Sequence, residues 1–144
     1  MNWTYKGNEV IDIPENAIGF VYIIECIING KKYVGKKLFH HTKTKVKTVK
    51  LKNGTSKKKK IREKVDSSWR DYYGSSDALK SDILSLGVDK FKREILYFCQ
   101  SKAVCSYLEA KLQFEYGVLE SDDWYNNNIM IRVHGNHIRG KIVS

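Results

Sequence analysis

Residues 19–37, GFVYIIECIINGKKYVGKK, constrain the fold of this chain more than any other segment. An apolar run rich in β-branched residues leads to Asn29-Gly30, and a second run begins directly after this pair. Asn-Gly is the dipeptide preferred at the tight turn of a β-hairpin. The segment therefore predicts two antiparallel strands, at 21–28 and 31–39, joined by a two-residue turn.

A two-residue turn also predicts the register between these strands. It places Tyr33 opposite Cys26, and it places Lys37 opposite Tyr22. The side chains of Tyr22, Tyr33 and Lys37 then share one face of the hairpin, because side chains alternate between faces along a strand. The same register separates the two tyrosines by about four residues, or roughly 13 Å of strand.

The positive charge of the chain is concentrated directly after this hairpin. Of the 26 lysines and arginines, thirteen lie between residues 36 and 64, where Glu63 is the only acid. Residues 40–66 show no clean period of 2 or 3.6, and their lysines repel one another, so we expect a mobile insertion. This concentration of positive charge favours binding of a polyanion, because neutralising phosphates releases condensed counterions. The segment has no aromatic anchor for a membrane surface, which favours nucleic acid.

The rest of the chain carries alternating helix and strand signals. A serine pair precedes an expected helix at about 77–86, and residues 91–99, FKREILYFC, predict a third strand. Residues 102–116 predict a second helix, and each helix is followed by a glycine. We therefore expect an α+β domain in which a three-stranded antiparallel sheet is flanked by helices.

The length of the chain suits one core of ordinary size. It has 144 residues, of which 42% are hydrophobic. We expect a single domain over residues 1–144, with the basic insertion at about 40–66 and a short basic tail at 131–144. The three cysteines lack metal-type spacing, and no segment is typical of a membrane span or a signal peptide, so we expect a cytoplasmic protein without membrane contact.

The hairpin resembles the motif of the GIY-YIG nuclease family. That motif has a glycine, one or two aliphatic residues and a tyrosine on a first strand, then Tyr-Ile-Gly or Tyr-Val-Gly about ten residues later. Residues 19–22, GFVY, and 33–35, YVG, take these places here. The sequence WRDYYGSS at 69–76, followed by LKSDILSLGVDKFKREIL, also resembles a subgroup of this family found in phage-encoded endonucleases.

The resemblance covers roughly residues 18–130 and implies which residues form the site. Glu109 in the second helix and Asn126 near the end of the domain occupy the family's matching places. By this resemblance Tyr22 would position or deprotonate the attacking water, Tyr33 would hydrogen-bond a phosphate or the water, and Asn126 would order the site. Glu109 would bind one divalent cation, Mg²⁺ with Mn²⁺ as an alternative, because Mg²⁺ needs few protein ligands and keeps most of its waters.

One position departs from the family pattern. The family usually has an arginine eight residues after the glycine of Tyr-Ile-Gly, where this chain has Lys43. Lysine supplies positive charge but not the bidentate fork of arginine. Lys37, Arg62 and Arg70 are alternative cations, and a histidine of the pair at 40–41 could take the polar role. A tyrosine base at neutral pH further requires that lysines and the metal lower its pKa from about 10.

The resemblance implies a DNA endonuclease of the phage or mobile-element type, acting in the host cytoplasm. A homodimer on DNA would allow double-strand cuts. The residues expected to bind DNA are Lys36, Lys37, Lys57, Lys58, Lys59, Lys60, Arg62 and Arg70.

Several other interpretations stay open. The same fold could be a nucleic-acid-binding module without turnover, because the usual arginine is absent. A second alternative is a ββα-type metal site, in which the histidines at 134–137 would have to converge with the pair at 40–41. Glu109 also fits a solvated helix edge or an ion pair with Lys102, and the lysine tract at 57–60 also fits a loop that only aids solubility.

Overall fold

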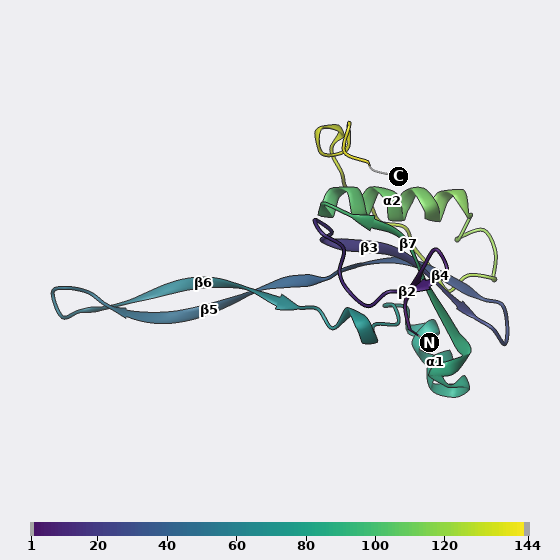
Figure 1. Cartoon of the computed structure of the whole chain (residues 1–144), viewed down its shortest axis with the longest axis horizontal. Coiled ribbons are helices and arrows are strands. Elements are labelled where there is room, and N and C mark those ends of the chain that lie inside the picture. The colour runs from purple at the N-terminus through teal and green to yellow at the C-terminus, as the bar shows by residue number, and fades with distance from the viewer. Residues whose placement is uncertain (1, 143–144) are drawn as a thin grey trace.

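The computed structural model describes residues 2–142, which form a five-stranded sheet, a separate two-stranded sheet and two α-helices (Figure 1). In chain order the strands are β1 (Thr4–Tyr5), β2 (Asn8–Glu9), β3 (Gly19–Cys26), β4 (Lys32–Leu38), β5 (His40–Lys50), β6 (Ser56–Asp66) and β7 (Phe91–Cys99). The helices are η1 (Trp69–Asp71), α1 (Asp77–Leu86), η2 (Val88–Lys90), α2 (Lys102–Glu115) and η3 (Gly135–His137). The predicted α+β class is confirmed.

The main sheet is larger than the three predicted strands. Its order is β2-β1-β7-β3-β4, and the three predicted strands, β7, β3 and β4, form antiparallel pairs between neighbours as expected. The middle strand of these three, β3, is antiparallel to both β7 and β4, which therefore run in the same direction. The additional strands β1 and β2 come from the N-terminus, and β1 runs parallel to β7. Two-residue strands leave no periodic signal in the sequence. They are held instead by tertiary contacts, since Trp3 is buried and its indole donates a hydrogen bond to the Trp69 carbonyl at 2.8 Å.

The two α-helices begin and end where local sequence signals place them. The Ser76 hydroxyl accepts a hydrogen bond from the Leu79 amide at 3.3 Å, which caps α1. Gly87, with φ of +96°, ends the same helix. Ser101 caps α2 in the same way, and the helix ends just before Gly117. Within residues 2–142 no helix is both long and apolar enough to cross a membrane.

Each face of the main sheet is covered by one helix, as Figure 1 shows. The α2 face buries aliphatic residues such as Val21 and Val34 from the strands. The opposite face, covered by α1, is largely aromatic and includes Phe20 and Tyr22. Because side chains alternate along each strand, β3 supplies both cores at once. The three cysteines are buried and free, as expected for core residues.

The hairpin formed by β3 and β4 has a different register from the predicted one. Tyr22 pairs with Gly35, and Ile24 pairs with Tyr33. The predicted pairing of Tyr22 with Lys37 is therefore wrong by two residues. The prediction that the two tyrosines share a face is confirmed, but the predicted separation of roughly 13 Å is wrong. Their ring centroids lie 6.1 Å apart.

The change of register follows from the turn between the two strands. Residues 27–31 connect β3 to β4, so the connection is longer than two residues. Gly30 has φ of +74°, and its amide donates to the Cys26 carbonyl at 2.9 Å. The Asn29 side chain accepts from the Lys31 amide at 2.9 Å. The Asn-Gly pair thus ends a longer loop here and does not form a type I′ turn by itself.

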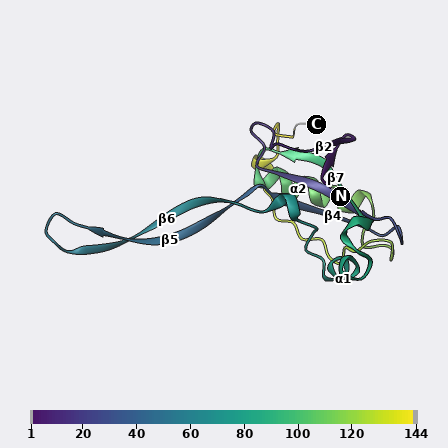
Figure 2. The same ribbon diagram turned by 60° about the horizontal axis from the view of Figure 1, so that its bottom comes forward.

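The basic segment at 40–66 forms a regular structure that the sequence analysis did not predict. It is an antiparallel hairpin of β5 and β6 that projects away from the body, as Figures 1 and 2 both show. We call this hairpin the arm. Thr and Val on β5 favour extended backbone, and the Asn53 side chain accepts from the Thr55 amide at 3.1 Å in the turn. The expectation of a segment without regular structure is therefore wrong, whereas its mobility stays a prediction.

A buried arginine fixes the connection between the arm and α1. The Arg93 side chain on β7 donates to the Arg70 carbonyl at 2.9 Å and to the Tyr72 carbonyl at 2.8 Å. Its guanidinium also stacks on Trp3 and Tyr73, at 4.6 and 4.0 Å from the ring centroids. Two satisfied carbonyls and two aromatic faces make this a strong anchor. It holds the segment that leads into the site described next.

Candidate active site

The candidate site lies along the free edge of β4. There the chain at 123–126 runs beside β4, because the Lys32 amide donates to the Asp123 carbonyl at 3.0 Å and the Tyr125 amide to the Lys32 carbonyl at 2.7 Å. The Asn126 side chain continues this pairing. Its oxygen accepts from the Val34 amide at 3.0 Å, and its amide donates to the Val34 carbonyl at 2.8 Å. Asn126 therefore clamps the Tyr33-Val34-Gly35 segment in place.

Tyr33 lies at the mouth of the site on the α1 side of β4. Its hydroxyl and the Ser75 hydroxyl form a hydrogen bond of 3.0 Å. Burial raises the pKa of Tyr33, and the Ser75 hydrogen bond partly opposes this. Gly74, with φ of +86°, packs against the same ring, since a Cβ there would lie 3.2 Å from a Tyr33 ring carbon. The segment held by Arg93 thus orients Tyr33.

Tyr22 is fully buried behind Gly35. Its hydroxyl has no hydrogen-bond partner within residues 2–142. Burial raises the pKa of Tyr22 well above its usual value, and the nearby Tyr72, Tyr33 and Glu109 raise it further. The protein's own groups therefore do not lower this pKa, as a tyrosine base would require.

Gly35 has a steric role at this site. A Cβ atom there would lie 2.7 Å from a ring carbon of Tyr22 and 2.8 Å from one of Tyr33, and it would overlap the Tyr22 hydroxyl. These ring atoms are packed and cannot move aside cheaply. The absence of a side chain at Gly35 therefore lets both tyrosines approach the strand.

Replacing Gly35 by Ala is expected to lower the free energy of unfolding by about 1–3 kcal/mol, because the new methyl group overpacks the two tyrosine rings. Urea denaturation measures this change. Gly135→Ala is the matched control, because a Cβ at Gly135 meets mainly the flexible end of Arg139. A Gly35→Ala protein as stable as the wild type would contradict the steric role.

Glu109 projects from α2 on the other side of β4. Burial raises the pKa of this carboxyl group, and the Lys36 ammonium and the Lys36 backbone amide both act to lower it. The Lys36 ammonium also donates to the Ser106 hydroxyl at 2.5 Å. The cation beside Glu109 is therefore Lys36 and not the predicted Lys102, which lies at the N-terminus of α2.

These side chains line one polar pocket of about 470 Å³. It is lined by Tyr33, Lys36, Ser75, Ser76, Asp77, Glu109, Gln113, Asn126, Asn127, Asn128 and Met130. Three of the predicted catalytic residues, Tyr33, Glu109 and Asn126, thus meet at one place. Among the described residues Lys36 is the one lysine or arginine in this lining.

The other predicted cations lie elsewhere. Lys43 is on β5 of the arm, opposite Glu63, and does not line the pocket. The Lys37 ammonium lies 4.1 Å from the centroid of the Tyr72 ring, on the α1 face of β4. Arg70 stacks on Trp69 at 4.4 Å and donates to the Ile11 carbonyl at 3.2 Å. The predicted DNA-binding residues Lys57, Lys58, Lys59, Lys60 and Arg62 all belong to β6 of the arm.

Six polar residues of the pocket were missing from the predicted site: Ser75, Ser76, Asp77, Gln113, Asn127 and Asn128. Ser75 and Asp77 enter it because α1 begins there, and their signal in the sequence was the capping serine pair. Gln113 donates to the Val34 carbonyl at 3.1 Å. Gln113 comes four residues after Glu109, so it lies on the same face of the helix, one turn later. That spacing was visible in the sequence, but the contact with β4 was not.

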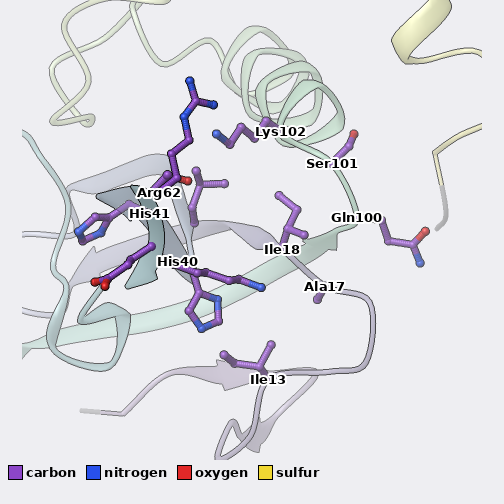
Figure 3. A pocket seen from close by; sticks show the side chains of 13 residues that line it. Ile13, Ala17, Ile18, His40, His41, Arg62, Gln100, Ser101 and Lys102 are labelled. Atoms are coloured by element: carbon purple, nitrogen blue, oxygen red, sulfur yellow. The ribbon is translucent and has the colours of Figure 1, made fainter. Parts of the chain in front are cut away.

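A larger cavity, of about 730 Å³, lies at the root of the arm; none of Tyr22, Tyr33, Lys43, Glu109 and Asn126 lines it, but the alternative cation Arg62 and the histidine pair at 40–41 do. Figure 3 shows that Ile13, Ala17 and Ile18 line it together with His40, His41 and Arg62 from the arm and Lys102 from α2. Its size does not make it the reactive centre. This cavity also has charged groups, such as Glu63 and Lys102, but it has an apolar wall and no tyrosine, whereas the polar pocket on β4 joins Glu109, Lys36 and Tyr33.

The residues of the polar pocket fit a single hard cation. Residues 2–142 contain no group of three or more His, Cys, Asp or Glu side chains close enough to hold a metal, so the four histidines do not converge. The pocket offers the carboxylates of Glu109 and Asp77 and the amide oxygens of Asn127 and Asn128. Oxygen donors of this kind suit Mg²⁺, which keeps several waters and takes further ligands from a phosphate. They do not suit Zn²⁺, which prefers His and Cys.

A family model described as "Putative endonuclease segE, GIY-YIG domain" matches residues 3–129. This match covers most of the chain, including the hairpin, the arm, both α-helices and Asn126. The chain belongs to the GIY-YIG endonuclease family. No curated protein and no solved structure matches the chain significantly.

Family membership confirms the resemblance and makes this an endonuclease-type domain. In this GIY-YIG domain the second motif, Tyr33-Val34-Gly35, is the part of the sheet that the pocket surrounds.

Proposed function

We propose that this GIY-YIG domain is a DNA endonuclease that hydrolyses phosphodiester bonds with one divalent cation, Mg²⁺ or Mn²⁺, at the polar pocket on β4. The observation that carries this proposal is the meeting of Tyr33, Lys36, Glu109 and Asn126 in that pocket. Phosphodiester hydrolysis needs an activated water and stabilisation of the charge that develops on the phosphate. A pocket that joins a carboxylate, an ammonium group and a phenol provides groups for both tasks.

Each side chain has a distinct role in this proposal. Glu109 would hold the cation, and such a cation polarises the phosphate and lowers the pKa of a bound water. Lys36 would place its ammonium against the phosphate oxygens and replace the usual family arginine. Tyr33 would donate a hydrogen bond from its hydroxyl to the phosphate or to the attacking water. Asn126 would act indirectly, because both ends of its amide are already bonded to Val34.

Of the two roles expected for Tyr22, positioning and deprotonating the attacking water, the second is disfavoured. Its raised pKa keeps the phenol neutral at physiological pH, so a phenolate base is disfavoured. A neutral Tyr22 can still donate a hydrogen bond from its buried and unpaired hydroxyl. We infer that it is a positioning residue, which supports Tyr33 and the strand at Gly35.

One observation favours the alternative of a binding module without turnover. Lys43, at the position of the usual arginine, lies on the arm and not in the pocket. If Lys36 cannot replace that arginine, the chain would keep its basic surface and bind DNA without cutting it. The two functions differ in a simple assay.

The first experiment incubates the purified protein with supercoiled plasmid in Mg²⁺, in Mn²⁺ and in EDTA. We expect nicked or linear plasmid with either metal and none in EDTA. DNA binding is measured with the same preparation by gel shift in EDTA. Salt-sensitive binding without cleavage in either metal would overturn the endonuclease and leave the binding module.

Three finer predictions accompany this proposal. They are the phage or mobile-element origin, action in the host cytoplasm and a homodimer on DNA. The first two rest on the resemblance described above. The third is checked by sedimentation of the protein with and without a DNA duplex.

A further inference from the structure

The arm is a two-stranded ribbon without a covering layer. β5 and β6 pair with each other and with no strand of the main sheet. Every residue from 41 to 60 is exposed. Isolated two-stranded ribbons are marginally stable in water, because neither face is buried. An exposed ribbon that projects from the body, as Figure 2 shows, therefore needs an explanation other than core packing.

The charge of the arm indicates the class of its partner. Residues 40–66 contain eleven lysines and arginines but only two acids, Glu63 and Asp66. Lys47 lies directly opposite Lys59, and like charges at opposing positions destabilise a hairpin. One ion pair, between Lys45 and Glu63 at 3.0 Å, relieves this repulsion. Charge repulsion therefore destabilises the arm in free solution, and binding of a polyanion would neutralise this charge.

The pairing register gives the two faces of the arm different chemistry. On one face three threonines and a valine of β5 lie opposite basic residues of β6. The pairs on this face are Thr42 with Lys64, Thr44 with Arg62, Val46 with Lys60 and Thr48 with Lys58. We call it the threonine face.

The other face of the arm carries lysines on both strands. Lys43, Lys45 and Lys47 of β5 share it with Lys57 and Lys59 of β6. This lysine face offers positive charge and no hydroxyl groups from β5.

The dimensions of the arm match one groove of duplex DNA. Eleven residues per strand, at a rise of about 3.3 Å each, give a length of about 36 Å. One turn of B-DNA is about 34 Å long, and its major groove admits a two-stranded β-ribbon. A threonine offers a hydroxyl group for base edges and a methyl group for the thymine methyl, whereas lysine and arginine bind guanine and phosphates.

We propose that the arm lies in the major groove of duplex DNA with its threonine face towards the base edges, so that it selects the sequence beside the cut. This inference rests on the proposed function in taking DNA as the substrate. The long lysines of the opposite face then reach back to the phosphates that flank the groove. The arm begins at His40, only four residues after Lys36, or at most about 13 Å of chain. A duplex that contacts the polar pocket can therefore continue along the arm.

The first test measures binding without cleavage, so that it does not depend on catalysis. The Glu109→Gln protein in EDTA is mixed with a pool of duplexes that contain a random 20-base-pair core, and the bound fraction is sequenced. We expect enrichment of a base preference. The triple variant Thr42→Ala, Thr44→Ala, Thr48→Ala in the same background should lose this preference, because it loses the hydroxyl and methyl contacts. Its affinity for the unselected pool should change by less than about threefold, since phosphate contacts supply non-specific binding.

A second variant tests the phosphate contacts of the lysine face. Replacing Lys47, Lys57 and Lys59 by Gln should weaken binding to the unselected pool by about 10²-fold at low salt. It should also reduce the slope of log affinity against log salt by about 2–3, or nearly 0.9 for each lost phosphate contact. Lys111→Gln on α2 is the control, because this exposed lysine is far from the arm in the chain. Thermal unfolding of all variants should be unchanged, since these arm residues pack in no core.

A third test examines the groove itself. Duplex RNA of the same random pool has a major groove too deep and narrow for a ribbon. We expect the Glu109→Gln protein to bind the RNA duplexes at least about tenfold more weakly than the DNA duplexes.

Each outcome decides for or against the proposal. Enrichment by the parent protein that the threonine variant loses supports it, as does weaker binding to RNA. Four results would overturn it: no enrichment by the parent, the same enrichment by the threonine variant, unchanged salt dependence of the Lys47, Lys57, Lys59 variant, or equal affinity for duplex RNA. None of these results requires that the protein cleave DNA, so a failure of the endonuclease proposal is seen separately in the plasmid assay.

Discussion

Replacing Glu109 by Gln is expected to reduce plasmid cleavage by at least about 10²-fold, equivalent to about 2.7 kcal/mol of transition-state stabilisation. Glutamine keeps the shape of the side chain but removes the negative charge that would hold the cation. The rate of plasmid nicking at saturating Mg²⁺ measures the effect. The loss should persist when Mn²⁺ replaces Mg²⁺, because both ions need the carboxylate.

The same substitution should not destabilise the fold. Burial raises the pKa of Glu109, so its ionised form is less favourable in the native state than in the unfolded chain. Its contribution to stability is present at low pH and is lost as pH rises through the native pKa. At neutral pH, Gln should therefore leave the free energy of unfolding unchanged or increase it, which urea denaturation can show.

Glu115→Gln is the matched control for this experiment. Glu115 lies on the same helix, is exposed and does not line the pocket. Cleavage by this variant should stay within about twofold of the wild type, as for most surface changes. A Glu109→Gln protein that cleaves normally would remove this carboxylate from the mechanism. One that is inactive but also unfolded would instead indicate a structural role.

The second large effect is expected at Lys36. Replacing it by Met should reduce the cleavage rate by about 10²-fold, because the ammonium group that faces the phosphate is lost while the aliphatic stem is kept. Lys36→Arg should retain most of the activity, since it restores charge together with the fork that the family usually provides. Lys111→Met on the exposed surface of α2 is the control and should behave as the wild type.

The pH dependence of the Lys36→Met protein distinguishes a contact with Glu109 from a purely structural role. In the wild type the Lys36 ammonium lowers the pKa of Glu109. Without it that pKa rises further, so the acidic limb of the pH–rate profile should move to higher pH. An unchanged profile together with normal activity would contradict both the electrostatic link and the catalytic assignment of Lys36.

Local signals in the sequence predicted the regular elements of the body well. The helix α1 and the strand β7 have the predicted bounds, because a capping serine, a terminating glycine and an alternating apolar pattern act over a few residues. The strands β1 and β2 could not be predicted in this way. They exist because Trp3 enters the aromatic core and hydrogen-bonds to the Trp69 carbonyl, far away in the chain.

The arm shows a different limit of sequence-based prediction. Its lysines concealed a signal that was present, since Asn53-Gly54 lies between two runs that contain Thr and Val. Charge repulsion argued for disorder, whereas cross-strand pairing formed a ribbon. The alternation of threonine and lysine along β5 could be assigned to two different faces only from the register, which places each Thr of β5 opposite a basic residue of β6.

By itself, the sequence determined the α+β class, the family and three of the residues in the pocket, Tyr33, Glu109 and Asn126. These follow from short-range patterns and from the order of motifs, which can be recognised in the sequence without knowledge of long-range contacts. Only the tertiary structure decided which cation joins them. Lys36 points to the face of β4 opposite Tyr33, and it reaches Glu109 because α2 packs on that face. The register between β3 and β4 also depended on the length of the loop at 27–31, which the Asn29-Gly30 dipeptide alone did not predict.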